Sequence, residues 1–167
     1  MIQVYTGNGK GKTTASIGLA LRAAGAGKNV YIAQFAKGRL YSEIKALRRF
    51  NNIKVEQFGR RCFIKKTPER VDIQMANKGL KRAGEIISKK KFQLVILDEI
   101  NIAVKLKLLS LGDLLKLIKS APRSMELILT GRYAHPKVIG LADLVSEVKE
   151  LKHYYNKGIK ARRGIEF

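Results

Sequence analysis

A glycine-rich stretch near the start of the chain constrains the fold more than any other feature. It reads VYTGNGKGKTT over residues 4–14, between a β-prone run at residues 2–5 and an apolar, small-residue segment that begins at Thr13. A strand, a glycine loop and a helix in that order form the phosphate-binding loop of nucleotide-binding proteins, whose usual pattern is G-x-x-x-x-G-K-[ST]. Thr6 stands where that pattern has its first glycine. This departure costs little if Gly7 takes the special backbone conformation.

The residues of this loop suit a triphosphate. Gly7, Gly9 and Gly11 lack a Cβ, so the backbone can point several N–H groups at phosphate oxygens, and the helix N-terminus adds partial positive charge. Lys12 is predicted to reach the outer phosphates and the Thr13 hydroxyl to bind Mg²⁺. The alternative, a glycine-rich turn beside a lysine-rich surface, does not account for the agreement of motif and context.

Two acids follow a fully apolar run further along the chain. Residues 92–97 read as a buried strand, and Asp98 and Glu99 come directly after it. An apolar strand that ends in an acid, downstream of a phosphate-binding loop, is typical of the second Mg²⁺-binding motif of P-loop NTPases. We expect Asp98 to lie beside the strand of the loop and to hold Mg²⁺ directly or through water. Glu99 could activate water, support the metal or contact the ribose. A polar strand end without a ligand is the alternative.

Strands and helices are predicted to alternate along the whole chain. The other expected strands are residues 30–35, 53–58, 126–130 and 144–151. One helix is expected from a Thr67 cap to about Lys90. Another is expected from a capping box of Ser110 and Asp113 to near Pro122. Such alternation predicts an α/β fold with a parallel sheet covered by helices on both faces.

Composition limits the class of protein further. The 167 residues are 46% hydrophobic, enough for the core of one domain spanning residues 1–167. The sequence has no apolar run of about 18 residues, so no transmembrane helix is expected. The first strand begins at the initial methionine, so no signal peptide is expected either. The single cysteine, Cys62, excludes an internal disulfide and a CxxC zinc site. A cytoplasmic protein without membrane attachment is therefore expected.

The charge of the chain is strongly basic. Thirty-four Lys and Arg residues against 13 Asp and Glu give a formal net charge of +21. Such a surface could bind nucleic acid without specificity, but its basic residues are spread over the whole chain. A solvated basic surface is therefore the favoured interpretation, and no specific nucleic-acid partner is expected. Arg132, just after the strand at 126–130, could neutralise phosphate or be an ordinary loop arginine.

Four stretches of the sequence resemble a known family. They are residues 4–38, 94–109, 127–132 and 141–167, the last with the pattern KH…GIK…GIEF. Together they resemble the P-loop type of cobalamin adenosyltransferases, the ATP:corrinoid adenosyltransferases of vitamin B12 assembly and salvage. Thr6 in place of the first glycine belongs to that family's pattern. The resemblance covers nearly the entire chain and implies a P-loop NTPase (RecA-like) fold with a mostly parallel sheet.

The resemblance implies that ATP serves as an alkyl donor. A reduced Co(I) corrinoid attacks the ribose C5′, and triphosphate leaves. Because Co(I) is itself a strong nucleophile, the protein needs no catalytic Ser, Cys or His, and supplies orientation and leaving-group stabilisation instead. Lys12 and Thr13 would be the catalytic residues. The implied partners are the reduced corrinoid, an electron-donating flavoprotein or corrinoid reductase, and a second copy of the chain in a homodimer.

Matching the family motifs residue by residue implies three sets of ligands. The nucleotide would contact Thr6, Gly7, Asn8, Gly9, Lys10, Gly11, Lys12, Thr13, Thr14, Arg22, Glu99, Asn101 and Arg132. Mg²⁺ would be held by Thr13, Asp98 and Glu99. The corrinoid would lie over the carboxyl edge of the sheet, near Lys37, Gly38 and Phe63.

Three alternatives share parts of this pattern. A RecA-like, nucleic-acid-dependent ATPase has the same fold and suits the charge of +21, although 167 residues leave little room for DNA-contacting loops. A thymidine-kinase-like enzyme shares the fold, but its usual zinc-binding cysteines are absent. A non-enzymatic nucleotide-binding regulator would preserve the same loop.

Overall fold

Six strands form one sheet in the computed structural model, which describes residues 1–38, 41–60 and 67–167. The strands are β1 (Ile2–Thr6), β2 (Val30–Phe35), β3 (Ile53–Phe58), β4 (Leu94–Asp98), β5 (Glu126–Thr130) and β6 (Leu144–Glu147). Their order across the sheet is β3-β2-β4-β5-β1-β6, and every neighbouring pair is parallel. The carboxyl ends of all six strands therefore meet at one edge.

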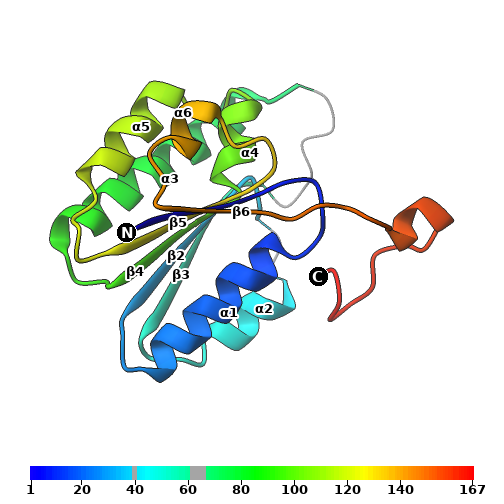
Figure 1. Cartoon of the computed structure of the whole chain (residues 1–167), viewed down its shortest axis with the longest axis horizontal. Helices are drawn as coiled ribbons and strands as arrows, with labels where there is room; N and C mark the ends of the chain where they lie inside the picture. The colour runs from blue at the N-terminus through cyan, green and yellow to red at the C-terminus, as the bar shows by residue number, and fades with distance from the viewer. Residues whose placement is uncertain (39–40, 61–66) are drawn as a thin grey trace.

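Helices cover both faces of this sheet. They are α1 (Lys12–Gly25), α2 (Ser42–Leu47), α3 (Arg70–Lys89), α4 (Ile100–Lys105), α5 (Leu111–Ser120), α6 (Pro136–Ile139) and the 3-10 turn η1 (Tyr154–Lys157). Figure 1 shows α1 and α2 on one face and α3 to α6 on the other. The expected parallel sheet with two covered faces is confirmed. Two-sided burial explains why β2 and β4 are apolar runs without alternation, because every residue of both strands is buried.

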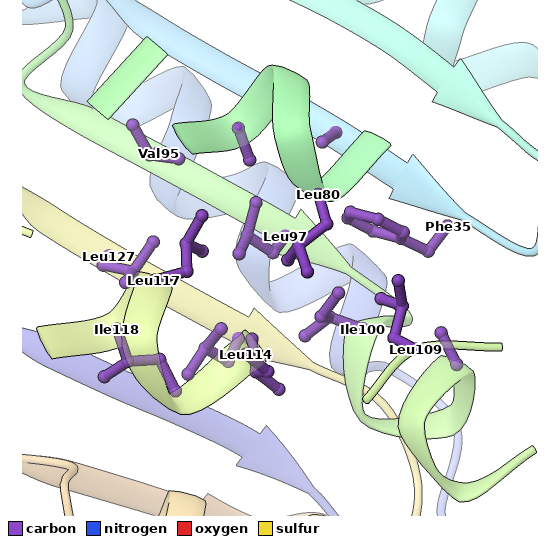
Figure 2. Close-up of a cluster of buried hydrophobic side chains, with 14 of the residues drawn as sticks. Phe35, Leu80, Val95, Leu97, Ile100, Leu109, Leu114, Leu117, Ile118 and Leu127 are labelled. Carbon is purple, nitrogen blue, oxygen red and sulfur yellow. The ribbon is translucent and has the colours of Figure 1, made fainter. Parts of the chain in front are cut away.

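The larger part of the core lies under α3 and α5. Leu80 of α3 and Leu117 of α5 point at β4 and its residue Leu97, as Figure 2 shows. On the opposite face, α1 packs through Ser16, Ala20 and Ala24, which lie four residues apart and are all buried. Because these side chains are small, α1 lies close to the sheet. This packing fixes the N-terminus of α1, and with it the loop that precedes the helix.

The strand order corrects one expectation about the site. Asp98 was expected beside the strand of the glycine loop, but β4 does not pair with β1. Strand β5 lies between them and pairs with both, Leu129 being opposite Leu97 on one side and Val4 on the other. Asp98 and the loop are therefore separated by one strand at the same edge of the sheet.

Helix boundaries were predicted in part. The Ser110 cap of α5 is confirmed, since the Asp113 N–H donates to the Ser110 hydroxyl at 3.4 Å. The Thr67 cap is wrong, because α3 begins at Arg70 with a capping box in which the Glu69 N–H donates to Asp72 at 2.9 Å. None of the helices in the described ranges combines the length and hydropathy needed to cross a bilayer.

Candidate active site

The loop between β1 and α1 has a conformation that depends on its glycines. Gly7 has a φ of 94° and Gly11 a φ of 119°, in the region that glycine reaches without strain. Gly7 thus takes the special conformation that the sequence assigned to it. Thr6 remains the last residue of β1, and its hydroxyl accepts the N–H of Ala134 at 3.2 Å. The substitution of Thr6 for the first glycine of the usual motif is therefore compatible with the loop.

The glycines also allow the loop to touch the chain that follows β6. The Gly9 N–H donates to the Val148 carbonyl at 2.8 Å. A Cβ on Gly9 would lie 2.8 Å from the carbonyl oxygens of Val148 and Lys149, and one on Gly7 would lie 2.4 Å from the Val148 oxygen. Side chains at these two positions would push the loop away from its support. A Cβ on Gly11 would meet nothing within 4 Å, so the loop is open on that side.

Lys12 lies inside this loop. Its ammonium donates to the Gly9 carbonyl at 2.6 Å, and the residue is 7% exposed. Burial lowers the pKa of the Lys12 ammonium; Glu99 opposes this shift, while the charges of Arg132 and Lys37 add to it. The charges of Lys12, Arg132 and Lys37 therefore lie near one another at the loop, and the carboxylates of Glu99 and Asp98 offset them in part. A polyanion such as a triphosphate would relieve their mutual repulsion.

Asp98 is the most constrained side chain of the site. It is 1% exposed and accepts four hydrogen bonds. Thr13 and Thr130 donate their hydroxyls to Oδ1 at 2.9 and 2.7 Å, and Lys37 and Gln34 donate to Oδ2 at 2.9 and 3.2 Å. The donors come from α1, β5, β2 and the residues after β2. Asp98 thus joins the loop helix to the carboxyl edge of the sheet, across the intervening strand.

Glu99 follows with a strained backbone. It has a φ of 60° and is the residue that precedes the first turn of α4. The left-handed region costs a non-glycine residue about 1–2 kcal/mol. Its N–H donates to the Thr130 hydroxyl at 3.0 Å, and its Oε1 lies 3.6 Å from the Lys37 ammonium. The strained turn therefore places the second carboxylate beside the first, at the same edge of the sheet.

These oxygens form a donor set that suits Mg²⁺. The Thr13 hydroxyl and the carboxylates of Asp98 and Glu99 are hard oxygen ligands, which Mg²⁺ prefers. One oxygen from each of them already lies within 3.6 Å of the Lys37 ammonium, so the position accommodates a positive charge. Among the described residues no group of three or more His, Cys, Asp or Glu side chains could hold a metal alone. Nucleotide and water oxygens would therefore have to complete the coordination.

The other residues assigned to the nucleotide differ in their positions. Arg132 is exposed just after β5, close enough for its charge to affect Lys12. Asn101 is 2% exposed in the first turn of α4, and neither its amide nitrogen nor its amide oxygen has a hydrogen-bond partner among the described residues. Arg22 is exposed in the last turn of α1, ten residues from Lys12, which corresponds to about 15 Å of helix. The structure therefore brings Arg132 to the loop and leaves Arg22 at the far end of α1.

The residues assigned to the corrinoid are only partly described. Lys37 lies with the predicted metal ligands. Gly38 packs against the backbone after β3, where a Cβ would lie 2.1 Å from the Gly59 carbonyl oxygen. Phe63 lies outside the described residues. Asn8, Lys10 and Thr14 are exposed on the loop and the first turn of α1, where a nucleotide can reach them.

The C-terminal segment, residues 148–167, contributes contacts that sequence reasoning missed. In Figure 1 it leaves the end of β6, runs past the loop and turns back toward α2. Glu166 forms a 2.9 Å ion pair with Lys10, whose ammonium also donates to the Tyr154 hydroxyl at 2.9 Å. Tyr154 donates to Glu166, and the Arg162 guanidinium lies 4.8 Å from the Tyr154 ring centre. The segment therefore holds the exposed side of the loop through Lys10.

Charge stabilises this contact. The hydrogen bond from Tyr154 lowers the pKa of the Glu166 carboxyl well below its ordinary range, and Lys10 and Arg162 add to the effect. Glu166 therefore stays ionised, and the contact persists, until the pH falls below the ordinary range of a glutamate. The pattern GIEF drew attention to this region, but nothing in the sequence indicated that its carboxylate, Glu166, pairs with Lys10.

Comparison with known proteins decides the family. Residues 1–167 match the profile described as ATP:corrinoid adenosyltransferase BtuR/CobO/CobP. The chain belongs to the ATP:corrinoid adenosyltransferase family. It is 36% identical over 169 residues to a corrinoid adenosyltransferase of Pseudomonas aeruginosa, covering 100% of this chain and 83% of that protein. It is 32% identical over 167 residues to the corrinoid adenosyltransferase CobA of Salmonella typhimurium, covering 100% and 85%.

Family membership identifies the substrates of the chain. An ATP:corrinoid adenosyltransferase binds ATP and a corrinoid and transfers the adenosyl group between them, as part of cobalamin metabolism. The resemblance seen in the sequence is thereby confirmed, as is the P-loop type of α/β fold. The roles of the individual side chains stay predictions.

Proposed function

We propose that the chain transfers the 5′-deoxyadenosyl group of ATP to the Co(I) centre of a reduced corrinoid and releases inorganic triphosphate. One observation carries the proposal. Lys12 is buried in a glycine loop with the charges of Arg132 and Lys37 close to it, in a chain that matches the family over residues 1–167. Such a cationic cradle binds a leaving group that carries several negative charges.

The reaction requires little covalent chemistry from the protein. Co(I) supplies the electron pair of the new Co–C5′ bond. The bond between C5′ and its phosphate oxygen breaks, and that electron pair leaves with the triphosphate. The protein therefore has to orient C5′ toward cobalt and stabilise the departing charge. In this proposal Lys12 exchanges the Gly9 carbonyl, its present partner at 2.6 Å, for a phosphate oxygen.

A divalent metal would be held by Thr13, Asp98 and Glu99. When bound there, Mg²⁺ neutralises part of the triphosphate charge. Thr130 and Gln34 orient the Asp98 carboxylate through their hydrogen bonds, so it needs little rearrangement. The remaining loop residues, from Thr6 to Thr14, would bind the phosphates through their backbone N–H groups.

The proposal extends to partners and location. The whole range 1–167 acts as one domain, in the cytoplasm, where ATP is supplied. Because Co(I) has to be generated by reduction, an electron-donating flavoprotein or another corrinoid reductase serves the enzyme. Exposed apolar side chains in the C-terminal segment, such as Leu151 and Tyr155, support a homodimer.

The test is an anaerobic assay with ATP, Mg²⁺ and a chemically reduced corrinoid. Adenosylcorrinoid and inorganic triphosphate should form in equal amounts. Lys12→Ala should lose about 10²–10³-fold in rate, because one charge opposite the leaving group is missing. Lys28→Ala, at an exposed lysine just after α1, is the control and should react like the unaltered protein. Formation of ADP and orthophosphate with an unchanged corrinoid, or ATP turnover stimulated by DNA, would contradict the proposal.

A further inference from the structure

The ammonium of Lys37 lies among the oxygens that we assign to the metal. Its Nζ is 2.9 Å from Asp98 Oδ2, 3.1 Å from Thr13 Oγ1 and 3.6 Å from Glu99 Oε1. Each of the three proposed metal ligands thus already contributes one oxygen to a cation. That cation is the ammonium of Lys37 itself.

The backbone before and after Lys37 directs its side chain to this position. Ala36 has a φ of 53°, which is unfavourable for a residue with a side chain, and its N–H donates to the Phe58 carbonyl at 3.2 Å. A Cβ on Gly59 would lie 2.4 Å from the Lys37 nitrogen. Residues 36–38 therefore pack backbone against backbone on residues 58–59. The fold maintains a strained turn at the point where Lys37 reaches the two carboxylates.

Charge balance explains why a cation is needed here. Asp98 is almost fully buried, and an unpaired buried carboxylate is strongly unfavourable. Lys12, the buried lysine of the site, donates to the Gly9 carbonyl instead. Lys37, 19% exposed, therefore supplies the charge that faces Asp98. The ammonium of Lys37 lies 2.9 Å from Asp98 and 3.6 Å from Glu99, so it faces both carboxylates.

Lys37 and Mg²⁺ compete for the same oxygens. Mg²⁺ takes its ligands at about 2.0–2.1 Å in a near-octahedral arrangement. An ammonium within 3.6 Å of the same three side chains leaves no room for that arrangement and would repel the ion. One of the two cations has to leave before the other binds.

We propose that the Lys37 ammonium occupies the position of the metal until nucleotide binds. It neutralises Asp98 and Glu99, excludes free divalent ions and yields its position when the metal arrives with the nucleotide. The inference rests on the ligand assignment in the proposed function. Its consequence is an order of binding, in which the metal enters with ATP, whose phosphates provide Lys37 with other anionic partners.

The test uses Mn²⁺ alone as the probe, without nucleotide or corrinoid, and measures its binding by electron paramagnetic resonance. Lys37→Gln should bind Mn²⁺ at least about tenfold more tightly than the unaltered protein, because a positive charge next to the ligands is gone. Lys37→Arg keeps the charge and should bind Mn²⁺ as weakly as the unaltered protein. Lys45→Gln is the matched control, since it removes a charge from an exposed lysine of α2 and should change nothing.

A second substitution locates the probe. Adding Glu99→Gln to Lys37→Gln should reverse the gain in Mn²⁺ affinity; if the gain persists, the ion binds elsewhere and the inference is wrong. Unchanged or weaker Mn²⁺ binding by Lys37→Gln would also overturn it. The unaltered protein offers a check that requires no folded variant. Mn²⁺ alone should leave its midpoint of thermal unfolding unchanged, and a clear rise would refute the exclusion of free ions.

These readouts involve no adenosyl transfer. If the enzyme produced ADP instead of triphosphate, the proposed function would fail while the Mn²⁺ results still decided the role of Lys37.

Discussion

Thr13 and Asp98 share a hydrogen bond of 2.9 Å, although 85 residues separate them in the chain. Thr13 belongs to the first turn of α1 and Asp98 to the end of β4, which is not a neighbour of β1. The bond therefore crosses the end of β5, where the Thr130 hydroxyl joins it by donating to the same carboxylate oxygen at 2.7 Å. The phosphate loop and the acidic strand end therefore form one hydrogen-bonded unit.

The first prediction is that substitutions of Asp98 and Glu99 differ in their effect on stability. Asp98→Asn places an NH₂ group among four donors, so at least one hydrogen bond is replaced by a donor–donor contact. We expect a loss of about 1–3 kcal/mol in the free energy of unfolding. Glu99→Gln, at a partly exposed side chain, should change that free energy by less than about 0.5 kcal/mol. Both should raise the Mg²⁺ concentration needed for adenosyl transfer by about tenfold or more.

Urea unfolding and Mg²⁺ titration of the reaction measure the two effects. An Asp98→Asn protein as stable as the unaltered one would contradict the hydrogen-bonded unit.

The second prediction concerns two glycines that differ in their surroundings. Gly9→Ala puts a methyl group 2.8 Å from two backbone carbonyl oxygens, so the loop or the C-terminal segment has to move. A loss of about 1–3 kcal/mol in unfolding free energy is expected. Gly18→Ala is the control within α1, where a Cβ meets nothing within 4 Å, and should stabilise the protein by about 0.5–1 kcal/mol. Equal urea midpoints for the two variants would show that residues 148–149 do not support the loop.

The third prediction is a dependence of stability on pH. Hydrogen bonds from Arg60 lower the pKa of the Asp72 carboxyl below its ordinary value of 3.8, and the Glu69 N–H contributes. Because the pKa is lower in the folded state, the stabilisation is complete above about pH 4 and disappears as the pH falls through the folded-state pKa. Asp72→Asn should therefore lower the unfolding free energy by about 2 kcal/mol at neutral pH, and by progressively less below pH 4.

Chemical denaturation between pH 3 and 7 measures this difference. Asp113→Asn, at the matching position in the first turn of α5 but half exposed, should change the stability by at most about 0.5 kcal/mol. A difference between the Asp72→Asn and unaltered proteins that stayed constant down to pH 3 would exclude the ionised pair with Arg60.

The fourth prediction tests how the C-terminal segment is attached. Glu166→Gln removes the negative charge that faces Lys10 and Arg162. The segment contains many lysines and arginines, so trypsin should cleave it several-fold faster in this variant. Glu150→Gln, which alters a carboxylate of the same segment that contacts Asn156, should be cleaved at the original rate. The idea fails if both variants are cleaved alike.

Local patterns predicted much of this molecule. The strands β2, β3 and β5 begin and end where the sequence placed them: β2 and β5 are mainly apolar runs, whereas β3 alternates apolar and polar residues over most of its length. The short helices α2, α4 and α6 were not predicted. Helices of four to six residues depend on tertiary packing, which no local pattern reports.

The residues of the candidate site were likewise predicted only in part. Lys12, Thr13 and Asp98 follow from motifs, since each stands at a fixed place relative to a strand or a glycine. The surroundings of Asp98 depend on which strands are neighbours: Gln34 lies opposite Asp98 in the register of β2 and β4, and β5 supplies a threonine. The strand order needed to see this was not available from local patterns, and neither was the pairing of Lys10 with Glu166.

The place of β1 between β5 and β6 affects how the protein is made. Ile2 pairs with Leu127 and Gln3 with Leu144, so β1 is translated long before either of its partner strands. At about 5–20 residues per second, the interval before β5 emerges is roughly 6–25 seconds. During that time β1 and the glycine loop have no neighbouring strand, and a nascent chain cannot form the nucleotide site. The apolar strands β2 and β4 can pair with each other meanwhile, so the half of the sheet away from the loop is the half that can form during synthesis.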